Sequence, residues 1–292
     1  MKKFLLFITT LLISQAVWGQ EYAFQTFKDR WVINTHSVEM LPKNRMDFRV
    51  THRFGDLAGE AGGWPTFYGL ESASDVLIGF EYGATDNLSV GVFRTKGAGD
   101  LKQLISPTVK YRLLQQESGG TPITLTAVGV GSISTMQKVD ESEGLNSFPK
   151  FSSRMVYNLQ MLAARKYSDA FSLQVSAGWT HRNLSPFGEL NDIFNVGFAT
   201  RIQVSHALSI VGDFVLPLNG VQSPFDDTDG PQYSPSIGVG IEIETGGHVF
   251  QINLVNSQGI MPTDYIPYTK DAEWSKGQFR LGFTISRMFK IR

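Results

Sequence analysis

The chain has no cysteine among its 292 residues. A disulfide framework and a thiolate metal site are therefore excluded. An excess of basic residues is missing as well. Two of the 26 Lys and Arg residues lie in the export signal described next, which leaves 24 against 27 Asp and Glu residues. Without surplus positive charge to neutralise phosphates, nucleic acid is not an expected partner.

Long apolar runs are also scarce. The one near the start, 4–13, is about half of the roughly 20 residues that a membrane-spanning helix needs. Lys2 and Lys3 precede it and Val17-Trp18-Gly19 follows, which predicts a cleavable signal peptide over 1–19. An uncleaved anchor is the alternative, and a lipoprotein is excluded because no cysteine follows. No other stretch approaches 18 consecutive apolar residues, so a helical membrane protein is excluded.

What the sequence does contain is hydrophobicity with a period of two. From residue 45 onward, segments of roughly ten residues place apolar side chains on one face and polar ones on the other, as in β-strands. The first segment, 45–54, sets one apolar series against one polar series: Met46, Phe48, Val50 and Phe54 against Asp47, Arg49, Thr51 and Arg53. We count twelve such segments, and no helical repeat competes with them.

The connections between these segments alternate in length. Short links fall near 42–44, 84–87, 115–120, 168–170, 204–207 and 245–247, and most links between them are longer, near 55–73, 136–150, 183–192, 219–232 and 257–275. This asymmetry predicts an all-β fold: an antiparallel transmembrane β-barrel of 12 to 14 strands with short periplasmic turns and long outer loops. A soluble β-sandwich also alternates, but its two stacked sheets give no reason for alternating loop lengths.

The mature chain then divides into two parts. Residues 45–292 form the predicted barrel, whose closure pairs every backbone amide within the lipid. Residues 20–44 form an N-terminal segment with two interpretations. Either 31–41 is a further strand that pairs with 22–27, or the segment folds inside the barrel as a plug.

Three runs carry a family resemblance: His52-Arg53-Phe54-Gly55-Asp56, then 67–75 (FYGLESASD), then 80–91 (FEYGATDNLSVG). The later Lys110-Tyr111-Arg112-Leu113-Leu114 is similar as well. In these runs the chain resembles a family of uncharacterised outer-membrane β-barrel proteins of Bacteroidota, defined as a domain of unknown function. The resemblance implies an outer-membrane barrel and brings no catalytic or binding residues. Unlike outer-membrane barrels in general, this chain does not end on an aromatic residue.

Charged residues opposite the apolar faces should line the lumen. They are Asp47, Arg49, Arg53, Glu81, Lys110, Arg112, Arg154, Arg182, Arg201, Asp213, Glu242, Glu244 and Arg280. A water-filled path with such a charge ladder would sort small polar or zwitterionic solutes. Alternatively, the charges pair across a narrow lumen and fill it. Aromatic residues are dense in the long loops, Tyr265 and Tyr268 among them, and could cap the barrel, contact a partner or stack on a ligand.

Signals for other chemistry are weak. The loop residues Asp226, Asp227 and Asp229 group three carboxylates, as calcium ligands do, but lack the remaining spaced ligands; an acidic turn is the simpler interpretation. His52 and His181 occupy two Thr-His-Arg runs at strand ends and are expected on the outer face near lipid headgroups. A paired metal or haem site would need their strands to be adjacent.

Catalysis is not expected. The sequence neighbours His36 and Ser37 would point to opposite faces of a strand, and His181, Asn183 and Ser185 share a face but run into a loop, so neither set fits a nucleophile and its base. We therefore expect no enzyme and no cofactor.

The sequence favours a passive pore or substrate-specific channel for small solutes, embedded in outer-membrane lipid. The alternative is a non-conducting barrel that is a structural or docking partner for a periplasmic or surface protein. Whether the lumen is open separates the two.

Overall fold

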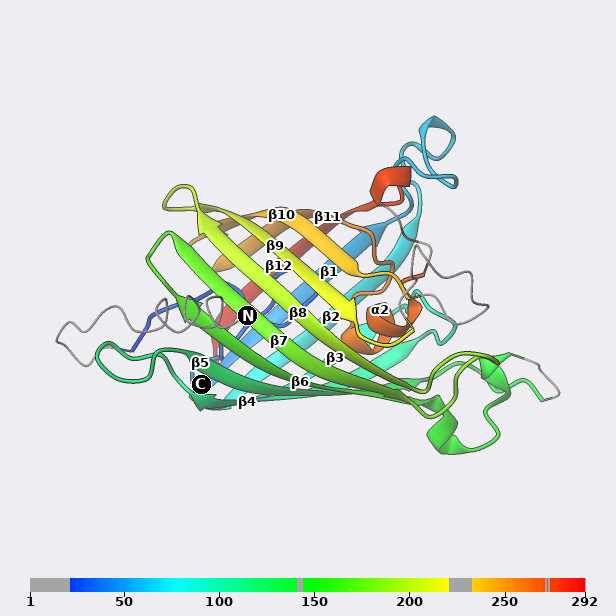
Figure 1. The fold of residues 1–292 in the computed structure, drawn as a ribbon, viewed down its shortest axis with the longest axis horizontal. Helices are drawn as coiled ribbons and strands as arrows, with labels where there is room; N and C mark the ends of the chain where they lie inside the picture. The colour runs from blue at the N-terminus through cyan, green and yellow to red at the C-terminus, as the bar shows by residue number, and fades with distance from the viewer. Residues whose placement is uncertain (1–21, 141–143, 221–232, 271, 273, 292) are drawn as a thin grey trace, which may run out of the picture.

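The computed structural model describes residues 22–140, 144–220, 233–270, 272 and 274–291. Twelve antiparallel strands form one closed barrel in which each strand pairs with its neighbours in sequence and β1 pairs with β12 (Figure 1). Closure leaves no unpaired sheet edge, as a lipid environment requires. The predicted all-β barrel of 12 to 14 strands is therefore confirmed, with the lower number.

The strands agree closely with the alternating segments of the sequence. They are β1 Arg45–Phe54, β2 Ala73–Thr85, β3 Leu88–Thr95, β4 Leu104–Leu114, β5 Thr124–Ser134, β6 Met155–Lys166, β7 Phe171–Arg182, β8 Asp192–Gln203, β9 Leu208–Pro217, β10 Ser236–Thr245, β11 His248–Val255 and β12 Arg280–Lys290. Within β1, Asp47, Arg49 and Thr51 are buried and the residues between them are more exposed. The polar face thus points inward, and the apolar face of side chains such as Leu159 and Val109 points outward.

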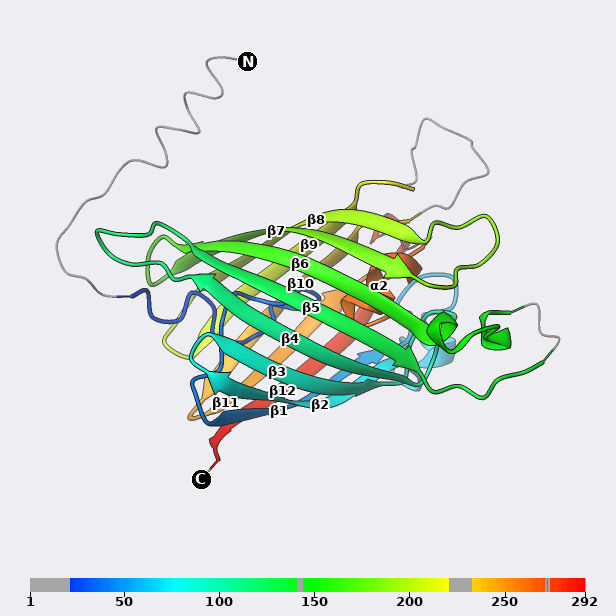
Figure 2. The same ribbon diagram turned by 90° about the horizontal axis from the view of Figure 1, so that it is seen from below.

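The two ends of the barrel differ as predicted. At one end, here called the short-turn end, compact turns such as Asp86–Asn87 and Gly246–Gly247 connect the strands. β1 begins and β12 ends at this end. The other end, here called the long-loop end, carries the extended connections, at the right of Figures 1 and 2. One connection differs from expectation: residues 96–103 between β3 and β4 form a loop at this end that the alternation of long links did not reveal.

Residues 22–44 contribute no strand to the barrel. The chain from Thr26 to Leu41 is almost entirely buried and lies inside the barrel, entering from the short-turn end (Figure 2, dark blue). A bridge between Trp31 and His36 and a hydrogen bond from Val32 N to Thr35 O (2.9 Å) close a tight turn at its inner tip. We call residues 22–44 the N-terminal hairpin.

The connection between β11 and β12 fills the lumen from the opposite end. Its short helix α2, Pro262–Tyr268, contacts β5, β6 and β7 from within the barrel (Figure 1). The side chains of Tyr265 and Ile266 are buried against Ile193, Val215 and Tyr233. Short 3-10 turns, η1 Trp64–Thr66, η2 Leu145–Ser147, η3 Phe151–Arg154 and η4 Trp274–Lys276, shape other long loops. Among the described residues, no helix has the length and apolar character needed to cross a bilayer.

Candidate functional site

The charged residues assigned to the lumen fall into two groups. Ten are buried side chains of the inner wall: Asp47, Arg49, Arg53, Glu81, Lys110, Arg182, Arg201, Asp213, Glu242 and Arg280. The other three, Arg112, Arg154 and Glu244, are only partly buried at the barrel ends. Arg112 donates to Asn87 and Asp86 in a short turn, and Arg154 lies over the ring of Phe148 in a long loop.

Four charges join the N-terminal hairpin to β1. Asp29 pairs with Arg49, and Arg30 pairs with Asp47 at 2.5 Å, so two anions and two cations balance in one buried cluster. Burial by itself would raise the pKa of the Asp29 carboxyl, but the guanidinium groups of Arg49 and Arg30 hold it below its usual range. Asp29 is therefore ionised, as a buried ion pair requires if it is not to leave an uncompensated charge.

The tip of the hairpin binds the opposite part of the wall. The carboxylate of Asp213 on β9 accepts backbone N–H bonds from Ile33 (3.2 Å), Asn34 (2.5 Å) and Thr35 (2.9 Å), and a side-chain bond from Asn34 (2.8 Å). Three consecutive N–H groups directed at one anion form a compact anion-binding turn. Asp213 thereby fixes the depth to which the hairpin enters.

Further contacts carry the hairpin across the full width of the lumen. The Gln174 side chain on β7 donates to His36 O (2.7 Å) and accepts from Val38 N (3.0 Å), while Lys110 on β4 donates to Glu39 O (2.5 Å). Burial and the nearby cations Lys110 and Arg49 lower the pKa of His36 well below its usual range, so its ring is neutral. Because β1 and β7 lie on opposite sides of a twelve-strand ring, the hairpin spans the lumen.

The hairpin and the β11–β12 loop meet inside the barrel. The side-chain oxygen of Asn34 accepts from Arg53 (2.5 Å) and from Ser257 (3.0 Å), and Arg53 also donates to the Ser257 hydroxyl (2.8 Å). The lumen is thus filled from both ends by segments that bond to each other and to the wall. Ion pairs such as Arg201 with Glu242, 3.2 Å apart, complete the filling.

Helix α2 carries a buried carboxyl group. Asp264 accepts the backbone N–H groups of Ala98 (2.9 Å) and Gly99 (3.0 Å) from the β3–β4 loop. Burial, with the negative charge of Asp75 nearby, raises the pKa of Asp264 to about 7 although these two hydrogen bonds oppose the shift. The carboxyl group of Asp264 therefore changes charge near neutral pH and holds α2 to the β3–β4 loop.

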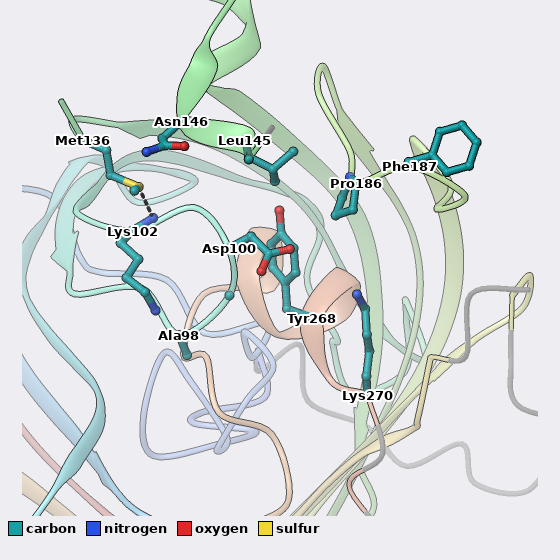
Figure 3. A pocket seen from close by; sticks show the side chains of 12 residues that line it. Ala98, Asp100, Lys102, Met136, Leu145, Asn146, Pro186, Phe187, Tyr268 and Lys270 are labelled. Carbon is teal, nitrogen blue, oxygen red and sulfur yellow. Dashed lines mark hydrogen bonds between the residues drawn. The ribbon is translucent and has the colours of Figure 1, made fainter. Parts of the chain in front are cut away.

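Above α2, at the long-loop end, lies a cavity of about 680 Å³ that we call the outer cavity (Figure 3). Its lining includes two lysines, an acid and several apolar side chains: Asp100, Lys102, Met136, Leu145, Pro186, Phe187, Tyr268 and Lys270. Its volume lies within the range of about 300–1,000 Å³ that is usual for small-molecule sites. Tyr268, the last residue of α2, forms part of its lining, so the filled lumen begins directly beneath.

A charge cluster supports one side of the outer cavity. Glu189 pairs with Arg182 (2.9 Å) and with Lys270, and the Arg182 guanidinium lies 5.3 Å from the ring centre of Tyr268. Arg182 also donates to the Tyr233 hydroxyl (2.9 Å). The amine of Lys270 is therefore already paired with a carboxylate.

The remaining sequence candidates lie elsewhere. His52 stacks on Phe283, on the outward apolar side of the wall, and His181 bonds to Asp192 at 2.8 Å. They lie on β1 and β7, which are not adjacent, so they form no paired site. The described residues contain no cluster of three or more His or acidic side chains arranged for a metal ion. Asp226, Asp227 and Asp229 lie outside the described residues.

The serine and histidine neighbours form no catalytic arrangement. The hydroxyl of Ser37 donates to Asp29 O (2.6 Å) and that of Ser185 to Glu189 O (3.4 Å), so each bonds to a backbone carbonyl and not to a histidine. Catalysis by these residues therefore has no geometric support.

Sequence reasoning missed the features that close the lumen from the long-loop end. Asp264 lies in a loop with no periodic pattern, and the short stretch 262–268 contains two prolines, which gave no helical signal. Tyr268 of the same loop was named among the aromatic residues that could cap the barrel, but without a place inside it. Asn34 lies in 31–41, which the sequence left open as a strand or a plug, and nothing in the pattern singled out this residue. The available signals were the length of the 257–275 link and its aromatic residues, since a long loop at a barrel end can fold inward.

A comparison with known protein families shows the family to which the chain belongs. Residues 27–289 match the family described as "Membrane bound beta barrel domain (DUF5777)". The chain belongs to this family. The match covers the barrel and most of the N-terminal hairpin, so the hairpin is part of the family domain. A comparison with curated protein sequences finds no match.

Two solved structures with a similar outline are a porin and an outer-membrane channel. The "KdgM porin" has a TM-score of 0.47 and 6% identity, with 85% of this chain and 99% of that chain covered. The COG4313 outer membrane channel from Pseudomonas putida F1 has a TM-score of 0.44 and 15% identity, with 86% and 98% covered.

Proposed function

We propose that the protein is an outer-membrane channel for small polar solutes that is closed at rest by its N-terminal hairpin. One observation carries this proposal. The segment that occupies the lumen precedes the first strand, has no strand in the sheet, and is covalently continuous with the wall at 42–44. It can leave toward the short-turn end without breaking any strand pairing of the barrel.

The chemistry of the wall supports the same function. Burying a charge costs free energy even when it is paired, so a permanently dry core gains from apolar side chains in its place. This lumen instead buries ten charged wall residues, including Lys110, Arg201 and Glu242. If the hairpin and the β11–β12 loop move aside, these side chains face water and form a polar, charge-lined path.

A second candidate is the non-conducting barrel that docks another protein. It is favoured by the apolar packing of the hairpin, whose Phe27, Trp31 and Val38 belong to one core cluster with wall residues such as Leu77 and Leu162. Such packing stabilises the filled state. The two candidates differ in whether the full chain ever conducts.

The test uses the absence of native cysteine. Ser286 is buried on β12, where its hydroxyl lies 3.4 Å from the Asp29 carboxylate, and Ser286→Cys places a nearly isosteric thiol on the wall beneath the hairpin. We expect the folded full-length variant to show ion current in planar bilayers, and a charged methanethiosulfonate reagent to reduce that current. Ser168→Cys, in an exposed short turn, is the control: its thiol should react without any change in current.

Two outcomes would contradict the channel. One is the absence of current from protein that migrates as a folded, heat-modifiable barrel, which would favour the docking function. The other is a current that stays unchanged after complete modification of the thiol at position 286, because the conducting path would then not pass the hairpin.

A further inference from the structure

The outer cavity contains two opposite charges on one loop that do not pair with each other. Asp100 and Lys102 both belong to the β3–β4 loop and both line the cavity. Among the described residues neither side chain has an ion-pair partner, whereas the amine of Lys270 on the other side is paired with Glu189. A carboxylate and an amine remain available to a solute.

The position of Asp100 is fixed by the residue before it. A Cβ atom at Gly99 would lie 2.2 Å from the ring of Tyr268, so the loop backbone passes directly against that ring, an approach that only glycine permits. Asp264 holds the same loop by accepting the N–H groups of Ala98 and Gly99. Asp100 is thereby placed beside the Tyr268 ring (Figure 3), where a bound cation would meet its carboxylate.

Lys102 is directed to a different part of the cavity. Its backbone N–H donates to the sulfur of Met136 (3.1 Å), which fixes the loop against the β5–β6 connection, and its side chain runs from there toward Ala98 (Figure 3). The apolar side chains Met136, Leu145 and Pro186 lie on the remaining walls. The cavity therefore offers one anionic point, one cationic point and an apolar surface.

We propose that the outer cavity binds small zwitterions with an apolar side chain, namely amino acids or short peptides. The ammonium group binds Asp100 beside the Tyr268 ring, the carboxylate binds Lys102, and the apolar side chain packs against Met136, Leu145 and Pro186. This inference names the solute class of the channel proposed above and rests on that function only for the step from binding to transport.

The two ends of the ligand must carry opposite charges, so a matched set of probes can test each end separately. The dipeptide L-alanyl-L-phenylalanine carries both charges, its N-acetyl form lacks the ammonium group, and its C-terminal amide lacks the carboxylate. We expect saturable binding of the free dipeptide to the full chain in calorimetry, and binding weaker by about two- to fivefold for each blocked form, as for exposed ion pairs.

Two variants then test which residue binds each charged group of the dipeptide. In Asp100→Asn the advantage of the free dipeptide over its N-acetyl form should disappear, while its advantage over the amide remains. In Lys102→Met the reverse should hold. Asp169→Asn and Lys290→Met make the same changes near the short-turn end and should leave both preferences intact.

Because binding is measured without ion flow, its failure is distinct from failure of the channel. Absence of saturable binding to folded wild-type protein would overturn the inference. So would equal affinity for all three probes, or unchanged preferences in both variants. A binding protein that never conducts would leave the inference standing and would contradict only the channel.

Discussion

The most unusual single residue is Asp264, a carboxylic acid enclosed in the interior at the end of the filled lumen. Burial and the charge of Asp75 raise its pKa to about 7. Between its ordinary value and this one, the folded protein keeps a proton that the unfolded chain has lost. The stabilisation that this group contributes is therefore fully present at low pH and is lost as the pH rises from about 4 through about 7.

This shift predicts a pH-dependent attachment of α2. Amide hydrogen exchange of residues 262–270, corrected for the intrinsic pH dependence of exchange, should show weaker protection at about pH 8 than at about pH 5. In Asp264→Asn, which stays neutral and keeps one oxygen acceptor for Ala98 or Gly99, the protection should vary much less with pH. An equal loss of protection in both proteins would show that another group titrates.

For single residues, the sequence predicted which face of a strand a side chain occupies, but not which residues that side chain contacts. The period of two placed Asp47, Arg49 and Asp213 on the inner face, where the structure has them. It could not indicate that Asp213 binds Asn34, because those residues are 179 positions apart. A contact of that kind depends on how closure of the barrel brings distant strands around one segment.

Among the elements, the N-terminal hairpin is the one for which the sequence left two interpretations open, a further strand or a plug. It lacks regular strand pairing. In many of its contacts with the wall, a backbone group of the hairpin bonds to a side chain of a strand far away in sequence. Its interior position brings these groups within hydrogen-bonding distance of the wall. Because no strand of the barrel depends on it, the hairpin and the barrel are separable in structure.

Removal of residues 22–41 should therefore leave a barrel that still migrates as a folded, heat-modifiable species. It should unfold at lower denaturant concentration, since side chains such as Phe27, Trp31 and Val38 no longer bury apolar surface. Its conductance in planar bilayers should be larger and steadier than that of the full chain. A variant that cannot close its sheet at all would show instead that the hairpin is needed as a template for folding.

In the molecule as a whole, the distribution of polar and apolar side chains is the reverse of that in a soluble protein. Apolar side chains face lipid around the wall, and charged ones face inward and are buried by the two filling segments. The outer face consequently tolerates charge poorly at mid-depth and better near either end.

A pair of substitutions on β4 tests this arrangement. Val109 lies at the middle of the strand and is 50% exposed, and Leu113 lies near the short-turn end and is 48% exposed. We expect Val109→Arg to reduce the free energy of unfolding in lipid vesicles by about 2–4 kcal/mol and Leu113→Arg by about 0–1 kcal/mol. Equal costs would contradict a bilayer centred on the barrel wall.

The sequence by itself determined the fold class, the inward face of each strand and the asymmetry between the two ends. These follow from local rules, because alternation and link length are properties of neighbouring residues. Only the tertiary structure decided that the lumen is filled, and by which segments. Filling depends on closure of the ring, which brings Asp213, Arg53 and Gln174 around one hairpin and encloses Asp264 beneath the outer cavity. No local pattern encodes contacts of that range.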